Sequence, residues 1–255
     1  ELESAANFGR LMAVFLWIYG FMSPVAGMVA DRVNRKWLIV GSLFVWSFVT
    51  LMMGYCTDFN QIYYLRALMG VSEALYIPAG LSLITDYHQE KTRSLAVGIH
   101  MTGLYVGQAL GGFGATVASA YTWETTFHWF GIIGIAYSVV LIIFLHDKKD
   151  QKAVKLENYP KENPISGAFK GLGMLFTNIA FWIILLYFAT PSLPGWATKN
   201  WLPTLFAENL SLDMSEAGPL STFTIAISSF IGVIAGGILS DKWIQRNVRG
   251  RVYTG

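Results

Sequence analysis

Long apolar stretches alternate with short charged segments along most of this 255-residue chain. A helix needs about 20 residues to cross the hydrocarbon core of a membrane, and stretches of about that length recur along the sequence. Because backbone polar groups find no water inside a bilayer, these segments must be helical. The pattern predicts an all-α polytopic membrane protein with about seven transmembrane helices. The predicted spans are 10–30, 38–57, 61–85, 94–117, 126–145, 174–206 and 217–240, and an eighth begins near residue 252.

The sixth predicted span, 174–206, is longer than one straight crossing requires. It contains Pro191 and Pro194. A proline inside a helix removes a backbone donor and introduces a kink. We therefore expect a bent or broken helix in this region.

Basic residues are distributed unevenly over the loops between these spans. Of the 18 lysine and arginine residues, 15 fall in alternate loops, which the positive-inside rule places in the cytoplasm. Basic loops and loops with few basic residues alternate along the whole series of predicted spans, as this orientation requires. The 15 residues are Arg32, Arg35, Lys36, Lys91, Arg93, Lys148, Lys149, Lys152, Lys155, Lys161, Lys170, Lys242, Arg246, Arg249 and Arg251.

The long connector at 146–170 is polar, rich in lysine and contains two prolines. Its composition is typical of a cytoplasmic linker between two helical bundles. We therefore divide the chain into a first bundle at 1–145, a linker at 146–173 and the start of a second bundle at 174–255.

Composition narrows the possible functions. Charged residues make up 13% of the chain, whereas a soluble domain carries about 25%. The net charge of +2 gives no reason to expect nucleic-acid binding. The sequence contains no nucleotide-binding motif, no His-Glu-x-x-His motif and no cluster of cysteine and histidine residues. We therefore expect no enzyme activity, no cofactor and no bound metal.

A glycine–acid–base turn occurs twice, each time at the end of an apolar stretch. The first copy runs from Gly27 to Asp31 and Arg32, and the second from Gly237 to Asp241 and Lys242. A repeat of this kind in a hydrophobic chain suggests two similar bundles of membrane helices, as transporters contain.

Two charged residues, Arg66 and Glu73, lie inside a predicted span. Charges in the bilayer are costly, so such residues usually face a cavity or a partner. Seven positions make about two helical turns, which puts both on one face about 10 Å apart along the axis. Arg66 could bind a carboxylate, and Glu73 could carry a coupling proton. The alternative is a structural charge network that holds neighbouring helices together.

Two further polar residues could contribute to the same chemistry. Tyr19 lies in the middle of the first span and could offer its hydroxyl to a polyol or a carboxylate, although packing is the alternative. His100, early in the fourth span, could carry a proton or could be satisfied by a neighbouring helix.

These features resemble the major facilitator superfamily, whose members have two six-helix bundles and a cytoplasmic central loop. The family signature Gly-x-x-x-Asp-Arg-x-x-x-[Arg/Lys] is matched by Gly27, Asp31, Arg32 and Lys36. The second copy of the turn matches the end of the eighth helix. The resemblance implies that the first helix is missing and that the chain holds helices two to eight and the beginning of nine.

Within the superfamily, the chain resembles the anion:cation symporter group, which includes galactonate, hexuronate, sialic-acid and vesicular glutamate transporters. Four segments carry this resemblance: Trp17-Ile18-Tyr19, Arg66 to Glu73 with Pro78, Glu90 to Ser94, and Trp201-Leu202-Pro203-Thr204.

The resemblance assigns roles to individual residues. It implies substrate contacts at Arg66, Tyr19 and Thr102, and proton coupling at Glu73; for His100 we weigh a coupling role against packing. The signature residues are expected to lock the cytoplasmic ends of neighbouring helices, or else simply to anchor the topology. This gating set is Gly27, Asp31, Arg32, Lys36, Asp241 and Lys242.

The predicted function is therefore secondary active transport. A small organic anion, such as a sugar acid, would be imported with a proton or a sodium ion by alternating access. An organophosphate/phosphate antiporter and a transporter-like membrane sensor are the alternatives. We expect a monomer in the lipid bilayer of a bacterial inner membrane, with the central loop in the cytoplasm.

Overall fold

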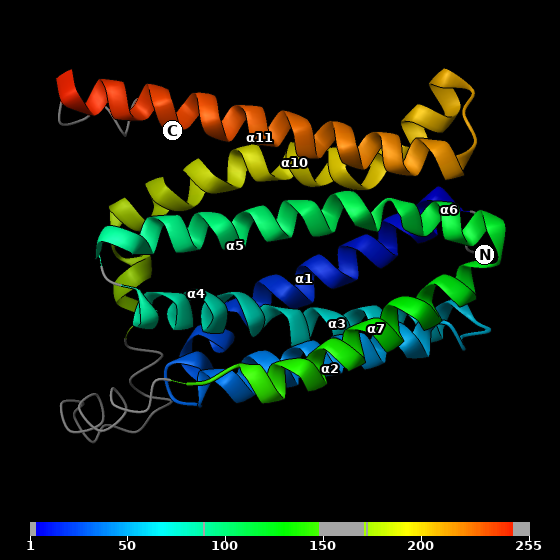
Figure 1. The fold of residues 1–255 in the computed structure, drawn as a ribbon, viewed down its shortest axis with the longest axis horizontal. Coiled ribbons are helices and arrows are strands. Elements are labelled where there is room, and N and C mark those ends of the chain that lie inside the picture. Colours follow the sequence, from blue (N-terminus) through cyan, green and yellow to red (C-terminus); the bar gives the residue numbers. More distant parts are fainter. Residues whose placement is uncertain (1–3, 89, 148–170, 172, 247–255) are drawn as a thin grey trace. The chain divides into compact units, whose positions relative to one another are not determined.

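The computed structural model describes residues 4–88, 90–147, 171 and 173–246. All regular secondary structure in these residues is helical, as the hydrophobic pattern predicted (Figure 1). The helices are α1 (Ala5–Ala30), α2 (Arg35–Met53), α3 (Phe59–Ala74), α4 (Tyr76–Tyr87), α5 (Glu90–Gly111), α6 (Phe113–Ala120), α7 (Trp123–Phe144), α10 (Ile179–Leu210) and α11 (Met214–Arg246).

Five helical segments of the described residues are long and apolar enough to cross a membrane. They are α1, α2, α3 together with α4, α7 and α10. The predicted spans 94–117 and 217–240 are helical but fall outside this set. The apolar stretch near residue 252 lies outside the described residues.

Side-chain caps explain where several helices begin. The Asn34 side chain accepts a hydrogen bond from the Trp37 backbone N–H at the start of α2 (3.3 Å). Thr122 accepts one from the Thr125 N–H at the start of α7 (3.2 Å). Such caps satisfy backbone donors that the first turn of a helix leaves free.

The predicted span 61–85 is divided between α3 and α4 at Leu75. Pro78 lies in the first turn of α4, where its missing N–H does no harm. The same missing N–H leaves the carbonyl of Ala74, four residues earlier, without its helical donor. A proline placed here therefore separates the two helices.

Two expectations about helix interruptions differ from the structure. The helix is not broken at Pro191 and Pro194, because a proline requires the loss of one hydrogen bond and not the end of the helix, and a bend there stays a prediction. α11 likewise continues past Asp241 and Lys242 to Arg246, so the second copy of the glycine–acid–base pattern is part of a helix and not a turn.

The described residues form two compact units. Unit 1 comes from within 1–99 and 121–195, and unit 2 from within 100–120 and 196–255. The predicted linker at 146–173 lies largely outside the described residues, so the division of the chain at this linker stays a prediction.

In unit 1, α1 packs on α3, and α2 packs on α7, α3 and α4 (Figure 1). One apolar cluster includes Leu11, Phe15, Val49, Met53, Ile62 and Met69. A second, near the other ends of these helices, includes Ala30, Leu38, Ile39, Ala79 and Leu83.

Glycines bring α7 against α2. A Cβ at Gly131 would lie 2.6 Å from the Leu51 Cα, and one at Gly134 would overlap the Ser47 side chain. Small residues at a helix interface allow this close backbone approach, which is common in membrane proteins.

In unit 2, α6 packs on α11. The Thr222 hydroxyl donates to the Ala109 carbonyl (3.1 Å), and the Thr116 hydroxyl donates to the Ser215 carbonyl (2.8 Å). Hydroxyl groups of this kind hold membrane helices together where apolar burial gives little driving force.

Candidate functional site

The contact between α1 and α3 brings three of the predicted site residues together. A Cβ at Gly70 of α3 would lie 2.8 Å from the Phe15 carbonyl oxygen and 3.2 Å from the Tyr19 nitrogen, both on α1. Glycine at this position therefore lets the two backbones touch. Arg66 lies four residues before Gly70 and Glu73 three residues after it, so both occupy the face of α3 that meets α1.

Arg66 is half-buried at this interface and contacts soft, uncharged groups. Its Nη1 atom donates to the Met69 sulfur (3.5 Å), and its Nη2 atom donates to the Met12 sulfur (3.6 Å). Its Cζ atom lies 4.9 Å from the centroid of the Phe15 ring. Within the described residues, the buried Nε atom has no hydrogen-bond partner and the guanidinium has no carboxylate partner. A thioether is a weak acceptor, so the group keeps most of its capacity to bind an anion.

Glu73 is half-buried on the same face of α3. It is close enough to Arg66 and to Tyr19 to interact with both electrostatically. Among the residues that the structure describes, its carboxyl group takes part in no ion pair and no hydrogen bond. Arg66 and Glu73 therefore interact electrostatically without a direct ion pair in the described residues, and a functional and a structural role for the pair both stay predictions.

Tyr19 lies one turn along α1 from Phe15, with the two ring centroids 5.9 Å apart. Ser23 donates a hydrogen bond to the Tyr19 backbone carbonyl (2.8 Å). The Tyr19 hydroxyl makes no hydrogen bond in the described portion of the chain. The contact between α1 and α3 thus contains a cation, a carboxyl group and a hydroxyl group, which belong to Arg66, Glu73 and Tyr19.

His100 and Thr102 belong to α5 and to unit 2, so the structure does not place them relative to Arg66. His100 is half-buried and Thr102 is exposed. Each of them has an interaction partner. Their assigned roles in coupling and substrate contact stay predictions.

The first copy of the signature forms the end of α1 and the turn that follows it. Asp31 is the C-cap, and its N–H donates to the Gly27 carbonyl (3.2 Å). Arg32 follows in the turn and has an interaction partner. Lys36, in the first turn of α2, donates from Nζ to the Ile142 carbonyl near the end of α7 (2.7 Å).

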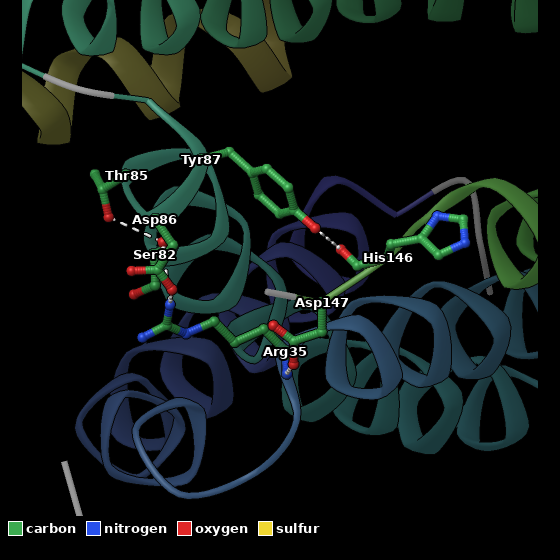
Figure 2. Close-up of polar contacts among 7 residues, drawn as sticks. All are labelled: Arg35, Ser82, Thr85, Asp86, Tyr87, His146 and Asp147. Atoms are coloured by element: carbon green, nitrogen blue, oxygen red, sulfur yellow. Dashed lines mark hydrogen bonds and ion pairs between the residues drawn. The ribbon is translucent and has the colours of Figure 1, made fainter. Parts of the chain in front are cut away.

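Arg35 was not singled out from the sequence, yet it is the centre of a polar cluster at this end of unit 1 (Figure 2). Its guanidinium forms an ion pair with Asp86 and donates to the Ser82 carbonyl of α4 (3.2 Å). Its backbone N–H donates to the Asp147 carboxylate (3.1 Å). The available signals were its place in a basic loop and an aspartate at the end of a predicted span.

A second contact joins α4 to the residues that follow α7. The Tyr87 hydroxyl donates to the His146 carbonyl (2.8 Å), as Figure 2 shows. The ends of α2, α4 and α7 are therefore tied together on the side that the charge pattern predicts to be cytoplasmic. Asp241 and Lys242 lie in α11, and their side chains are outside the described part of the structure.

The sequence of this chain is similar to those of known transporters. The chain matches the family profile described as Major Facilitator Superfamily over residues 1–254. It is 25% identical over 258 residues to the "Hexuronate transporter" of Bacillus subtilis (strain 168), covering 96% of this chain and 58% of the relative. It is 24% identical over 252 residues to the "Probable L-galactonate transporter" of Escherichia coli (strain K12), covering 95% and 55%. The chain thus spans little more than half the length of these relatives.

A solved structure has a similar fold. It is a bacterial homolog of the human lysosomal transporter Spinster in an inward-facing, unoccupied conformation, with a TM-score of 0.72. The two sequences are 22% identical, and the match covers 95% of this chain and 56% of that one. At this identity, the similarity establishes the fold alone.

Proposed function

This chain belongs to the Major Facilitator Superfamily, and from that premise we propose that it is part of a secondary active transporter that imports a small organic anion, such as a sugar acid. The family consists of integral membrane transporters and not of enzymes. Relatives named as hexuronate and galactonate transporters support an organic acid as the substrate.

The main support for the proposal is the environment of the Arg66 guanidinium. A guanidinium half-buried between membrane helices, without a carboxylate partner in the described residues, is a ready site for a carboxylate. Arginine presents a planar fork of donors that can bind both carboxylate oxygens at once. The nearby Tyr19 hydroxyl is suited to a hydroxyl group of the substrate, and Thr102 is a third proposed contact.

Coupling requires a group that changes charge during the cycle. We assign this role to Glu73, because its carboxyl group lies on the face of α3 that carries Arg66 and has no partner among the described residues. His100 is a second proposed proton carrier. A proton or a sodium ion on Glu73 would balance the charge of the bound anion, and the bundles would then rock about the site.

Gating is proposed at the predicted cytoplasmic end of the bundle. There Gly27, Asp31, Arg32 and Lys36 connect α1 to α2 and α7. Asp241 and Lys242 would form the corresponding part of the second bundle. Bacterial relatives and the basic loops support an inner-membrane location with the central linker in the cytoplasm.

The test uses the full-length protein in proteoliposomes and a panel of sugar acids, amino acids and sugar phosphates. Arg66→Ala should abolish binding and uptake of the organic anion while membrane insertion stays normal. The matched control is Arg10→Ala, which removes an exposed arginine of α1 and should leave uptake unchanged. Normal uptake by the Arg66→Ala protein, or failure of the wild-type protein to bind any organic anion, would refute the proposal.

A further inference from the structure

The guanidinium of Arg66 is held by a specific set of uncharged neighbours. Met12 and Phe15 come from α1, and Met69 comes from α3. The two sulfur atoms lie 3.6 and 3.5 Å from Nη2 and Nη1, and the Phe15 ring centroid lies 4.9 Å from Cζ. Phe15 and Met69 are buried, so these contacts are fixed by the packing of α1 on α3.

These neighbours orient a cation without neutralising it. A thioether sulfur is a weak acceptor, and an aromatic face attracts a cation through its quadrupole. Neither forms the strong paired hydrogen bonds that a carboxylate offers to arginine. A guanidinium held in this way can exchange its contacts for an incoming carboxylate at little cost.

A competing carboxylate lies on the same face of α3. Glu73 is about two helical turns from Arg66 and interacts with it electrostatically, but no ion pair joins them in the described structure. Extended side chains could span that distance. In the structure, the guanidinium instead contacts the Met69 and Met12 sulfur atoms.

We propose that Met12 and Met69 are positioning residues which, with the Phe15 ring, hold the Arg66 guanidinium apart from Glu73 and keep it free for an anionic substrate. The statement about substrate rests on the proposed function, whereas the statement about Glu73 does not. Met12 and Met69 thus act through Arg66 and do not need to contact the substrate themselves.

The first measurement asks whether Arg66 turns to Glu73 when the sulfur atoms are removed. The variant Met12→Leu/Met69→Leu conserves side-chain volume, which cores tolerate well. In the wild-type protein, Glu73→Gln removes no ion pair and should change the Tm little. In the double-leucine background, Glu73→Gln should lower the Tm by at least about 3 °C more, because it would break a newly formed pair.

The second measurement is the affinity for the sugar acid that gives the largest thermal shift with the wild-type protein. The double-leucine variant should bind it about tenfold more weakly, which corresponds to about 1.4 kcal/mol. Adding Glu73→Gln to that variant should restore the affinity to about that of Glu73→Gln alone. A purely structural role for the methionines would give no such restoration.

The matched control is Met53→Leu, which alters a buried methionine of the same apolar cluster whose sulfur, among the described residues, accepts no hydrogen bond from Arg66. It should leave both the affinity and the response to Glu73→Gln unchanged. If the double variant fails to fold, Met12→Leu alone, at the half-buried position, is measured in the same way. An equal Tm response to Glu73→Gln in all backgrounds would overturn the proposal. If the wild-type protein binds no organic anion, the proposed function fails, and the Tm comparison still decides the role of the methionines.

Discussion

Gly70 is the position at which a single methyl group should disturb the proposed site most directly. In Gly70→Ala, the new Cβ would lie 2.8 Å from the Phe15 carbonyl oxygen and 3.3 Å from the Ile18 Cβ. Two of the nearest atoms are α1 backbone, which cannot rotate away as a flexible side chain can. α1 and α3 must therefore separate by several tenths of an ångström.

The loss of stability in Gly70→Ala is measured against the same substitution at a glycine that has room for a methyl group. Overpacking of this kind typically costs about 1–3 kcal/mol. The matched control is Gly80→Ala on α4, a buried position where the nearest neighbour of a new Cβ is the Tyr76 ring at 3.9 Å. Both substitutions gain the same helix propensity, so their difference isolates the steric term. Gly70→Ala should be less stable than Gly80→Ala by about 1–3 kcal/mol.

The assay is thermal unfolding of the full-length protein in detergent, together with uptake in proteoliposomes. Separating α1 from α3 also moves Tyr19 away from Arg66 and Glu73, so uptake should fall more in Gly70→Ala than in Gly80→Ala. Equal stability and equal uptake of the two variants would refute the close helix contact on which the site is built.

Three further predictions address other parts of the chain. Asp86→Asn should lower the free energy of unfolding by about 1–3 kcal/mol, because it breaks a largely buried charge-assisted contact with Arg35. In the double variant, adding Arg35→Ala should cause little further loss, and additive losses in thermal unfolding would contradict the pairing. Glu73→Gln should lose proton-driven accumulation in proteoliposomes but keep exchange of substrate, and unchanged pH-driven accumulation would remove Glu73 from the coupling role. Burial raises the pKa of the Cys56 thiol, so less thiolate is present at neutral pH and labelling should accelerate as the pH rises above neutrality. Cys56 follows the end of α2 at Met53, so an impermeant maleimide should reach it from outside the cell, with Cys56→Ser as the control. Labelling only from the cytoplasmic side would reverse the predicted orientation.

Much of the fold was predictable because the bilayer restricts what a sequence can do. A span must be apolar, helical and about 20 residues long, and these requirements are visible in the sequence. Helix interruptions were harder to predict. Pro78 separates α3 from α4, whereas α10 continues through Pro191 and Pro194. A proline removes one hydrogen bond in every case, and its neighbours decide whether the helix continues.

The candidate site was predictable only in part. Arg66 and Glu73 stand out because charges are rare in membrane spans. Met12 and Met69 gave no signal, because methionine is common in apolar helices and its role depends on which helix lies opposite. The pairing of Arg35 with Asp86 was missed for a similar reason, since Arg35 begins α2 and Asp86 lies near the end of α4, and the two meet only after α2 packs on α4.

The glycine contacts between α7 and α2 have a mechanical consequence. Gly131 meets the α2 backbone at Leu51, and Gly134 meets the Ser47 side chain, so sliding of one helix along the other would cause a steric clash. The Lys36 contact with the Ile142 carbonyl fastens one end of the pair, and the His128 ring lies over Gly54 at the opposite end. α2 and α7 should consequently move together as one rigid unit. Changes of shape within unit 1 should then occur mainly in α1, α3 and α4, and the interruption at Leu75 between α3 and α4 is the expected hinge.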